Sequence, residues 1–159
     1  MNLSRTKVTD VWLEHLKGLA QLERLELSLT QVGSAELVHL KGLTQLRELA
    51  LSCLKVTDAG LDHLKDLQGL EGLHFTHVGV TNDGLKHLKE LTNLTELWFV
   101  NTYVSDAGVK DLQAALPKCK ITKSVGVVRV AQVLEHERPT AARGRHTGNR
   151  FGGGSLPSR

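Results

Sequence analysis

Residues 46–64 read LRELALSCLKVTDAGLDHL and contain two kinds of hydrophobic periodicity. In the first half, Leu49 and Leu51 alternate with small or polar residues, which predicts a short strand with one buried face. In the second half, Leu61 and Leu64 recur three residues apart, as on one face of a helix. The stretch therefore predicts a strand that is followed by a short helix.

The same pattern returns every 24 residues without a gap, as Leu3, Leu27 and Leu51 illustrate. Such a period is typical of a solenoid, in which each unit buries its hydrophobic face against the next. Six hydrophobic columns keep this register, and they begin at Leu3, Val8, Leu13, Leu16, Leu22 and Leu25.

Each predicted helix is preceded by a residue with a short polar side chain. Such side chains accept hydrogen bonds from the free N–H groups at the start of a helix. We therefore predict that they cap five short helices, near residues 11–18, 35–42, 59–66, 83–90 and 107–115. The column consists of Asp10, Ser34, Asp58, Asn82 and Asp106.

The run formed by Leu22, Leu25, Leu27 and Thr30 resembles the signature of leucine-rich-repeat proteins. Residues 56–61, VTDAGL, resemble the helix-forming half of the 24-residue type, which occurs in bacterial repeat proteins and in ribonuclease-inhibitor-like and F-box proteins. The resemblance implies an α/β leucine-rich-repeat solenoid of about five units over residues 1–123. It is right-handed, with a parallel sheet on the concave face and short helices on the convex face.

One turn position departs from the family pattern in the middle units. It holds Thr6, Thr30 and Thr102 in three units but Leu54 and Val78 in two others. The two hydrophobic residues cannot form a side-chain hydrogen bond to the turn backbone. We expect packing to hold those two turns instead.

The two ends of the repeat region differ. Met1 falls in the column of Leu25, so the chain begins in mid-strand and an N-terminal cap is absent. We expect a partner, a second copy or further chain to cover this end, and self-association there is one option. At the other end, residues 116–121 resemble a final turn with a last strand. We predict a weakly structured extension over 124–137 and a disordered basic tail over 138–159.

Charge is distributed unevenly along the chain. Residues 124–159 hold six Arg and two Glu, which leaves 14 basic and 15 acidic groups in residues 1–123. The basic character therefore belongs to the tail, and the repeat region gives no reason to expect nucleic-acid binding. No signal peptide and no membrane-spanning hydrophobic run is visible. Cys53 and Cys119 lie almost three repeats apart, which argues against a disulfide and favours a cytoplasmic location.

Histidines also recur at the repeat period. Each lies about 100° around its helix from the leucine stripe, at an edge position. We expect these rings to pack between neighbouring helices, because a ladder spreads ligands along the stack and a metal needs them to converge. Their protonation is expected to crowd like charges and loosen the stack. The column consists of His15, His39, His63 and His87.

The concave face is the best candidate for a functional surface. Strand alternation places Trp98 on it in solvent, with His74 about 5 Å away in the neighbouring strand. Exposed Trp is enriched among binding hot spots. The alternative is that Trp98 only covers Tyr103 or residues 125–130. The predicted partner-binding residues are Trp98, His74, His77, Glu96, Glu48 and Asn101.

No catalytic grouping or phosphate-binding loop is recognisable, so we expect neither an enzyme nor a bound cofactor or metal. The favoured function is a protein–protein interaction module that binds a macromolecular partner on its concave sheet. One alternative is a substrate-recognition fragment of a larger assembly, such as an F-box-type ubiquitin-ligase receptor or a bacterial multidomain protein. A third is salt-sensitive nucleic-acid contact through the Arg-rich tail.

Overall fold

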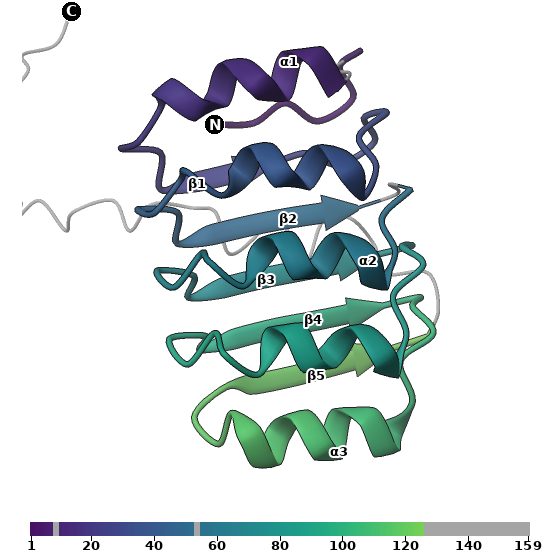
Figure 1. Cartoon of the computed structure of the whole chain (residues 1–159). Coiled ribbons are helices and arrows are strands. Elements are labelled where there is room, and N and C mark those ends of the chain that lie inside the picture. Colours follow the sequence, from purple (N-terminus) through teal and green to yellow (C-terminus); the bar gives the residue numbers. More distant parts are fainter. Residues whose placement is uncertain (8–9, 53–54, 126–159) are drawn as a thin grey trace, which may run out of the picture. The chain divides into compact units, whose positions relative to one another are not determined.

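A computed structural model describes residues 1–7, 10–52 and 55–125, which belong to one compact unit. Its centre is a sheet of five parallel strands in the order β1-β2-β3-β4-β5, so each strand pairs with the next one along the chain (Figure 1). The strands are β1 (Arg24–Glu26), β2 (Glu48–Ser52), β3 (Gly72–Thr76), β4 (Glu96–Val100) and β5 (Lys120–Ser124).

The strand register reproduces the period of the sequence. Leu49 pairs with Leu73, and Leu73 pairs with Leu97, so each partner lies 24 residues further on. Asn2 forms an isolated bridge with Glu26 in the same register, which confirms that residue 2 lies at a strand position. Every column of the sequence therefore becomes a row of neighbouring side chains across the sheet.

Short helical segments cover one face of the sheet and stack side by side (Figure 1). Their positions confirm the five predicted segments, but about half of the helical residues are in 3₁₀ rather than α turns. In a 3₁₀-helix, residues three apart lie above one another, so leucines spaced by three all point to the core. The segments are α1 (Asp10–Glu14), η1 (His15–Gly18), η2 (Ala35–Leu40), α2 (Asp58–Leu61), η3 (Asp62–Leu64), η4 (Asn82–Leu88) and α3 (Asp106–Ala115). None of the described helices is long and apolar enough to cross a membrane.

The core between helices and sheet is one continuous hydrophobic cluster made mostly of leucine. Its largest side chains are Phe75 and Phe99, both fully buried. Their rings stack with centroids 5.6 Å apart and planes 9° from parallel. Because the two residues are register partners on β3 and β4, the ring pair joins two adjacent repeats.

Polar side chains close the core at the last repeat. Lys123 is the register partner of Phe99, so it occupies a core-facing position on β5. Its ammonium reaches the Asp106 carboxylate on α3, at 2.5 Å. Lys118, which stands where earlier units have leucine, is exposed as expected for a terminal unit. The predicted features of residues 126–159 lie outside the described residues.

Three of the five side chains predicted to cap the helices bond to the following repeat. Asp58 Oδ1 accepts the backbone N–H of Thr81 at 2.8 Å, and Asp58 Oδ2 accepts the Thr81 hydroxyl at 2.7 Å. Asn82 accepts the N–H of Ser105 at 2.9 Å and donates to its hydroxyl at 2.8 Å. We call these residues the polar ladder; its members are Ser34, Asp58 and Asn82.

The capping prediction was therefore wrong for the polar ladder. In α2, η4 and α3 the N-caps are Thr57, Thr81 and Ser105, each one residue before the predicted cap. Ser34 is the N-cap of η2 as predicted, but its side chain makes no capping hydrogen bond. Thr81 accepts from the N–H of Asp83 at 3.2 Å, and Ser105 accepts from the N–H of Gly108 at 3.1 Å. Asp58 and Asn82 are already the first residues of α2 and η4, and from there their side chains reach the neighbouring repeat.

A glycine in each of three helices makes room for the ladder. A Cβ added at Gly84 would overlap the carboxylate of Asp58, and one added at Gly108 would overlap the amide of Asn82. The absence of a side chain at these positions lets the ladder residue reach its partner backbone. The polar ladder therefore depends on glycine at positions 60, 84 and 108 of the following helices.

The turn after each strand is held in the two ways that the sequence indicates. The hydroxyls of Thr6 and Thr30 donate to the carbonyls of Leu3 and Leu27, at 2.5 and 2.9 Å. Val78 is buried in the core, which confirms that packing holds its turn. Thr102 differs, because its hydroxyl is buried and has no hydrogen-bond partner among the described residues. The other hydrophobic turn position, residue 54, lies outside the described part of the chain.

Cys119 offers a first test of the packing. Its side chain is buried beside β5, and burial raises the pKa of the Cys119 thiol to about 11, with the Glu96 carboxylate adding to the rise. Because the thiolate is the reactive form, iodoacetamide should leave this residue unmodified in the native protein at pH 8. The peptide that contains residue 119, followed by mass spectrometry, should react only after guanidinium unfolding. Rapid labelling of the native protein would contradict the buried position. The other cysteine, residue 53, lies outside the described residues.

Candidate functional site

The sheet face opposite the helices, which we call the open face, is built from alternate strand residues. The leucines and phenylalanines of each strand point to the core, and the residues between them point away. Register arranges the latter on β2, β3 and β4 as three rows. The rows are Glu48–Gly72–Glu96, Ala50–His74–Trp98 and Ser52–Thr76–Val100.

Trp98 and His74 form a ring pair in the middle row. Their ring centroids lie 6.0 Å apart with planes inclined by 35°. The predicted neighbourhood is therefore confirmed, but the expectation that Trp98 stands in solvent was wrong. Both side chains are half-buried. Among the described residues, the indole N–H of Trp98 makes no hydrogen bond.

The alternative role of Trp98, covering Tyr103 or residues 125–130, is not supported for the residues that the structure describes. In that alternative Trp98 covers Tyr103, yet the Tyr103 side chain is 77% exposed. Val125 is 84% exposed, and residues 126–130 lie outside the described part of the chain. Trp98 therefore buries neither Tyr103 nor Val125.

His77 and Asn101 lie at the edge of the open face, directly after β3 and β4. The Asn101 side-chain nitrogen is 2.9 Å from His77 Nε2. Both residues have left-handed backbone conformations, with φ of 54° and 50°, as does Leu29 with φ of 57°. Asn and His adopt this conformation more often than other residues with a side chain, whereas Leu seldom does. The 24-residue register thus brings together two of the predicted site residues.

The two predicted glutamates have different surroundings. Glu48 is exposed and forms an ion pair with Arg24 at 3.2 Å. Glu96 is half-buried and forms no ion pair with any described residue. The strands β2, β3 and β4 themselves contain these two carboxylates and no Lys or Arg. The centre of the open face is therefore negative.

Two residues differ from the sequence-based picture of this face. Strand alternation places Val100 on the open face, yet its side chain is only 2% exposed; its register partners on the neighbouring strands are Thr76 and Ser124. Tyr103, on the loop after β4, was not predicted as a contact residue although it is strongly exposed. A signal existed, since the column of Tyr103 contains Lys7, Gln31 and Lys55 in other units, all of them exposed.

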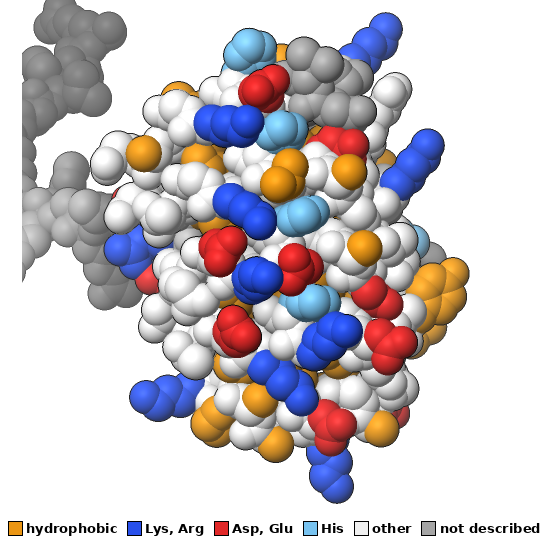
Figure 2. Space-filling view, viewed as in Figure 1, with side chains coloured by type: hydrophobic (Ala, Val, Ile, Leu, Met, Phe, Trp, Pro, Cys, Tyr) orange, Lys and Arg blue, Asp and Glu red, His pale blue; other side chains and the backbone are white. Residues whose placement is uncertain are grey.

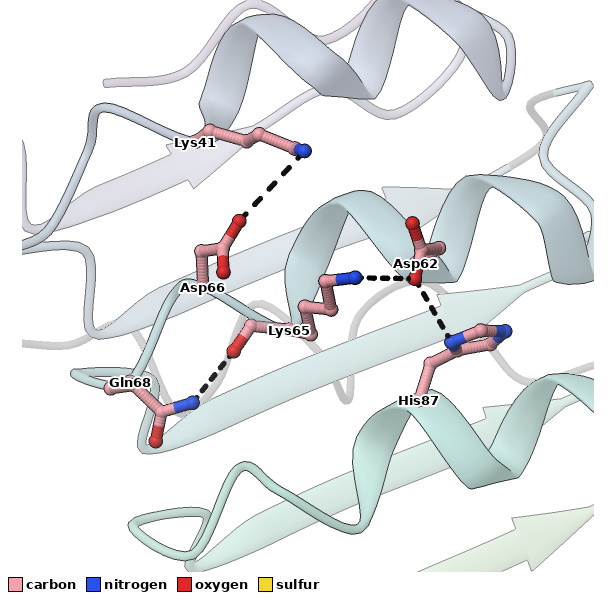
Figure 3. A network of polar contacts seen from close by, with 6 residues as sticks. All are labelled: Lys41, Asp62, Lys65, Asp66, Gln68 and His87. Atoms are coloured by element: carbon pink, nitrogen blue, oxygen red, sulfur yellow. Dashed lines mark hydrogen bonds and ion pairs between the residues drawn. The ribbon is translucent and has the colours of Figure 1, made fainter.

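The helix side carries a network of ionic groups. Figure 2 shows lysines and histidines running down this side, and Figure 3 shows the network around Asp62. Lys65 Nζ lies 2.9 Å from Asp62 Oδ1, and His87 Nδ1 lies 3.3 Å from the same oxygen. Lys41 approaches Asp66 at 3.8 Å.

Among the four histidines that recur at the repeat period, three are half-buried, which confirms the packing prediction for His39, His63 and His87. The fourth, His15, is exposed. Protonated His87 would face the Asp62 carboxylate, so the expected crowding of like charges is offset in this repeat. Within residues 1–7, 10–52 and 55–125, no three His, Cys, Asp or Glu side chains converge to hold a metal.

Asp62 gives a pH-dependent prediction. The hydrogen bond from Lys65 lowers the pKa of Asp62 below its ordinary value of 3.8. A carboxylate with a lowered folded pKa contributes stability above its unfolded pKa and loses it as the pH falls through the folded value. The melting-temperature difference between wild type and Asp62→Asn should therefore be largest above about pH 4.5 and shrink at lower pH. The same difference should be smaller in a Lys65→Gln background, and a difference independent of pH in both backgrounds would refute the pairing.

A polar hollow of about 360 Å³ lies away from these sites, where the loops lead into β2, β3 and β4. The ion pair between Arg47 and Glu71 crosses its wall. Asn93 donates to the carbonyl of Gln68 at 2.7 Å, and the Thr95 hydroxyl donates to the carbonyl of Glu71 at 3.1 Å. The full lining is Thr44, Gln45, Arg47, Gly69, Glu71, Asn93 and Thr95.

The chain matches no protein-family model and no curated protein sequence. Its solved structural neighbours include internalin C2 from Listeria monocytogenes, with a TM-score of 0.62 and 23% identity over 80% of this chain and 53% of the internalin. Another is actin-binding site 2 of leiomodin-1, with a TM-score of 0.58 and 20% identity over 74% of this chain and 78% of that one. The chain spans about half the length of the internalin. At these identities the likeness concerns the fold, which is the α/β leucine-rich-repeat solenoid.

Proposed function

We propose that this protein is a protein–protein interaction module that holds its partner on the open face of the sheet. The main support for this proposal is the ring pair of Trp98 and His74, which is partly exposed on the sheet face that no described helix covers. A large ring that is packed on one side and open on the other is a typical binding anchor, because little side-chain entropy is lost on contact. His77, Asn101, Glu48 and Glu96 surround it and supply polar contacts.

The structural neighbours support a binding role in general terms. The leiomodin-1 structure is that of an actin-binding site, so a solenoid of this geometry serves protein recognition in that molecule. The repeat scaffold sets the shape of the surface, and a few side chains set the partner. The proposal includes no catalytic activity, and on the low cysteine content it places the protein in the cytoplasm.

A capture experiment tests the proposal. The full chain, the Trp98→Ala variant and the control Lys89→Ala are each immobilised and incubated with lysate of the source cells. Lys89 is exposed just after η4, on the helix side. We expect a protein held by wild type and the control but lost from Trp98→Ala. Titration of that purified protein should show an affinity at least about 30-fold weaker for Trp98→Ala. Equal affinity for all three chains would refute the proposal, as would a lack of any captured protein.

The larger-assembly reading is a second candidate. The observation that favours it is that the chain corresponds to about half of the internalin. In this reading the open face recognises a substrate for a larger protein, as F-box-type receptors or bacterial multidomain proteins with the 24-residue repeat type do. Recovery of effector subunits together with the captured partner would favour it, and recovery of the partner alone would count against it.

A further inference from the structure

We infer that the open face receives one lysine or arginine side chain of the partner protein above Gly72, between the carboxylates of Glu48 and Glu96. The inference rests on the proposed function and specifies the chemistry of the partner. The three residues form one row on adjacent strands, in the register Glu48–Gly72–Glu96. A sheet face with this charge pattern fits a basic side chain better than a neutral or acidic one.

Gly72, which has no side chain, lies between the two glutamate-bearing strands and is buried by its neighbours. A Cβ placed there would be 3.5 Å from Glu48 Cγ and 3.9 Å from His74 Nε2, which are ordinary contact distances. A side chain at residue 72 itself would therefore fit at ordinary contact distances, whereas a partner's side chain would lie above the neighbours that bury the glycine.

The two carboxylates provide the charge. Adjacent strands lie about 4.8 Å apart, so a cation above β3 is about 5 Å to the side of each flanking strand. Glutamate side chains are long enough to reach it from both sides. Glu96 has no ionic partner among the described residues. Glu48 is already paired with Arg24, but an exposed pair of this kind is weak and exchanges readily.

The ring pair provides a third contact. Trp98 lies two residues beyond Glu96 on the same face, and His74 lies two residues beyond Gly72. A guanidinium or ammonium near an indole face gains cation–π attraction, about 0.5–1 kcal/mol at exposed sites. The same residues that anchor the partner would therefore also help hold its cation.

Charges at the ends of the row limit the partner to a local cation. Arg24 precedes Glu48 in register, and Lys120 follows Glu96. A uniformly basic surface would meet repulsion at both ends. A single basic side chain with neutral or acidic neighbours meets only the negative centre.

The test uses capped peptides, so it does not depend on identifying the partner. The probe is acetyl-Gly-Gly-Arg-Gly-Gly-amide, and its matched control contains citrulline, which is neutral and nearly the same shape as arginine. Both are titrated into the ¹⁵N-labelled full chain at low salt. We expect the arginine peptide to shift the Trp98 indole N–H and Gly72 amide signals saturably in the millimolar range, and the citrulline peptide to shift them at least tenfold less. Trp98→Phe assigns the indole signal. Equal shifts from both peptides would overturn the inference.

Two variants locate the contact. Gly72→Lys places an ammonium of the protein's own between the carboxylates and should weaken arginine-peptide binding at least tenfold. Glu96→Gln removes one negative charge and should weaken this binding at least threefold. Thr76→Lys adds the same charge to the same face of β3, about 13 Å away, and should weaken binding less than twofold. Equal weakening by Gly72→Lys and Thr76→Lys, or no effect of Glu96→Gln, would contradict this placement.

The inference and the proposed function fail separately. If capture of a partner depends on Trp98 but the partner binds Gly72→Lys as tightly as Thr76→Lys, the open face is the interface. In that case the inferred contact with a basic side chain of the partner is wrong. If the arginine peptide binds as described but Trp98→Ala captures the same proteins as wild type, the cation site stands and the proposed function is wrong.

Discussion

Replacing Phe99 by alanine should lower the free energy of unfolding by about 3–5 kcal/mol, the usual cost of removing a buried aromatic ring. Phe99 is fully buried and stacks on Phe75 in the neighbouring repeat. The variant therefore loses both its own hydrophobic burial and a contact that couples two units. Because a solenoid is stabilised by contacts between neighbouring repeats, the loss should be concentrated in the C-terminal units.

Urea unfolding followed by circular dichroism measures the expected loss. Native-state hydrogen exchange should show earlier opening of β4 and β5 than of β2 in the variant. Tyr103→Ala is the control, because its exposed ring should contribute less than about 0.5 kcal/mol. A Phe99→Ala variant as stable as the control would contradict the packing described here.

Replacing Asp58 by alanine should cost about 1.5–3 kcal/mol. The Asp58 carboxylate accepts both the backbone N–H and the hydroxyl of Thr81, 23 residues further on. Without it, a partly buried N–H group of the next repeat loses its acceptor. The cost of leaving such a donor unpaired exceeds the mean value of a hydrogen bond.

The next repeat supplies the matched control for Asp58. Asn82 occupies the equivalent position and makes the equivalent bonds to Ser105. Asp58→Asn should therefore retain the ladder and most of the stability. Thermal and urea unfolding of the two variants would separate the interpretations. If Asn and Ala were equally destabilising, the negative charge would matter rather than the bond, and if neither had an effect, the ladder would not contribute.

The repeat architecture was predictable because one period of 24 residues fixes both strand register and helix placement. Once Leu49 was assigned to the core, Leu73 and Leu97 had to lie beside it. The local character of the helices was harder to predict. The exact three-residue spacing of Leu37 and Leu40 suits a 3₁₀ turn, but an α-helical face tolerates the same spacing.

The polar ladder could not be predicted from one repeat at a time. Asp, Asn and Ser near a helix start accept from backbone N–H groups in either case. Whether the donor belongs to the same helix or to the next repeat depends on the distance between units. The overlap that a Cβ would cause at Gly84 shows how close that distance is.

For the candidate site, the sequence predicted the neighbours but not their exposure. The register alone places His74 beside Trp98, and the structure confirms it. How far a ring protrudes depends on rotamers and on the packing of one ring against the other, which no column shows. The role of Gly72 is similar, because a missing side chain is informative only when the flanking residues are known.

The binding face itself is the central claim, and site-directed photocrosslinking tests it most directly. A benzoylphenylalanine is introduced in place of Thr122, the register partner of Trp98 on β5, and separately in place of Lys89 on the helix side. Both full-length proteins are irradiated in the source cells. We predict a discrete crosslinked protein from position 122, and none from position 89. Crosslinks to the same proteins from both positions, or from position 89 alone, would contradict a partner bound on the open face.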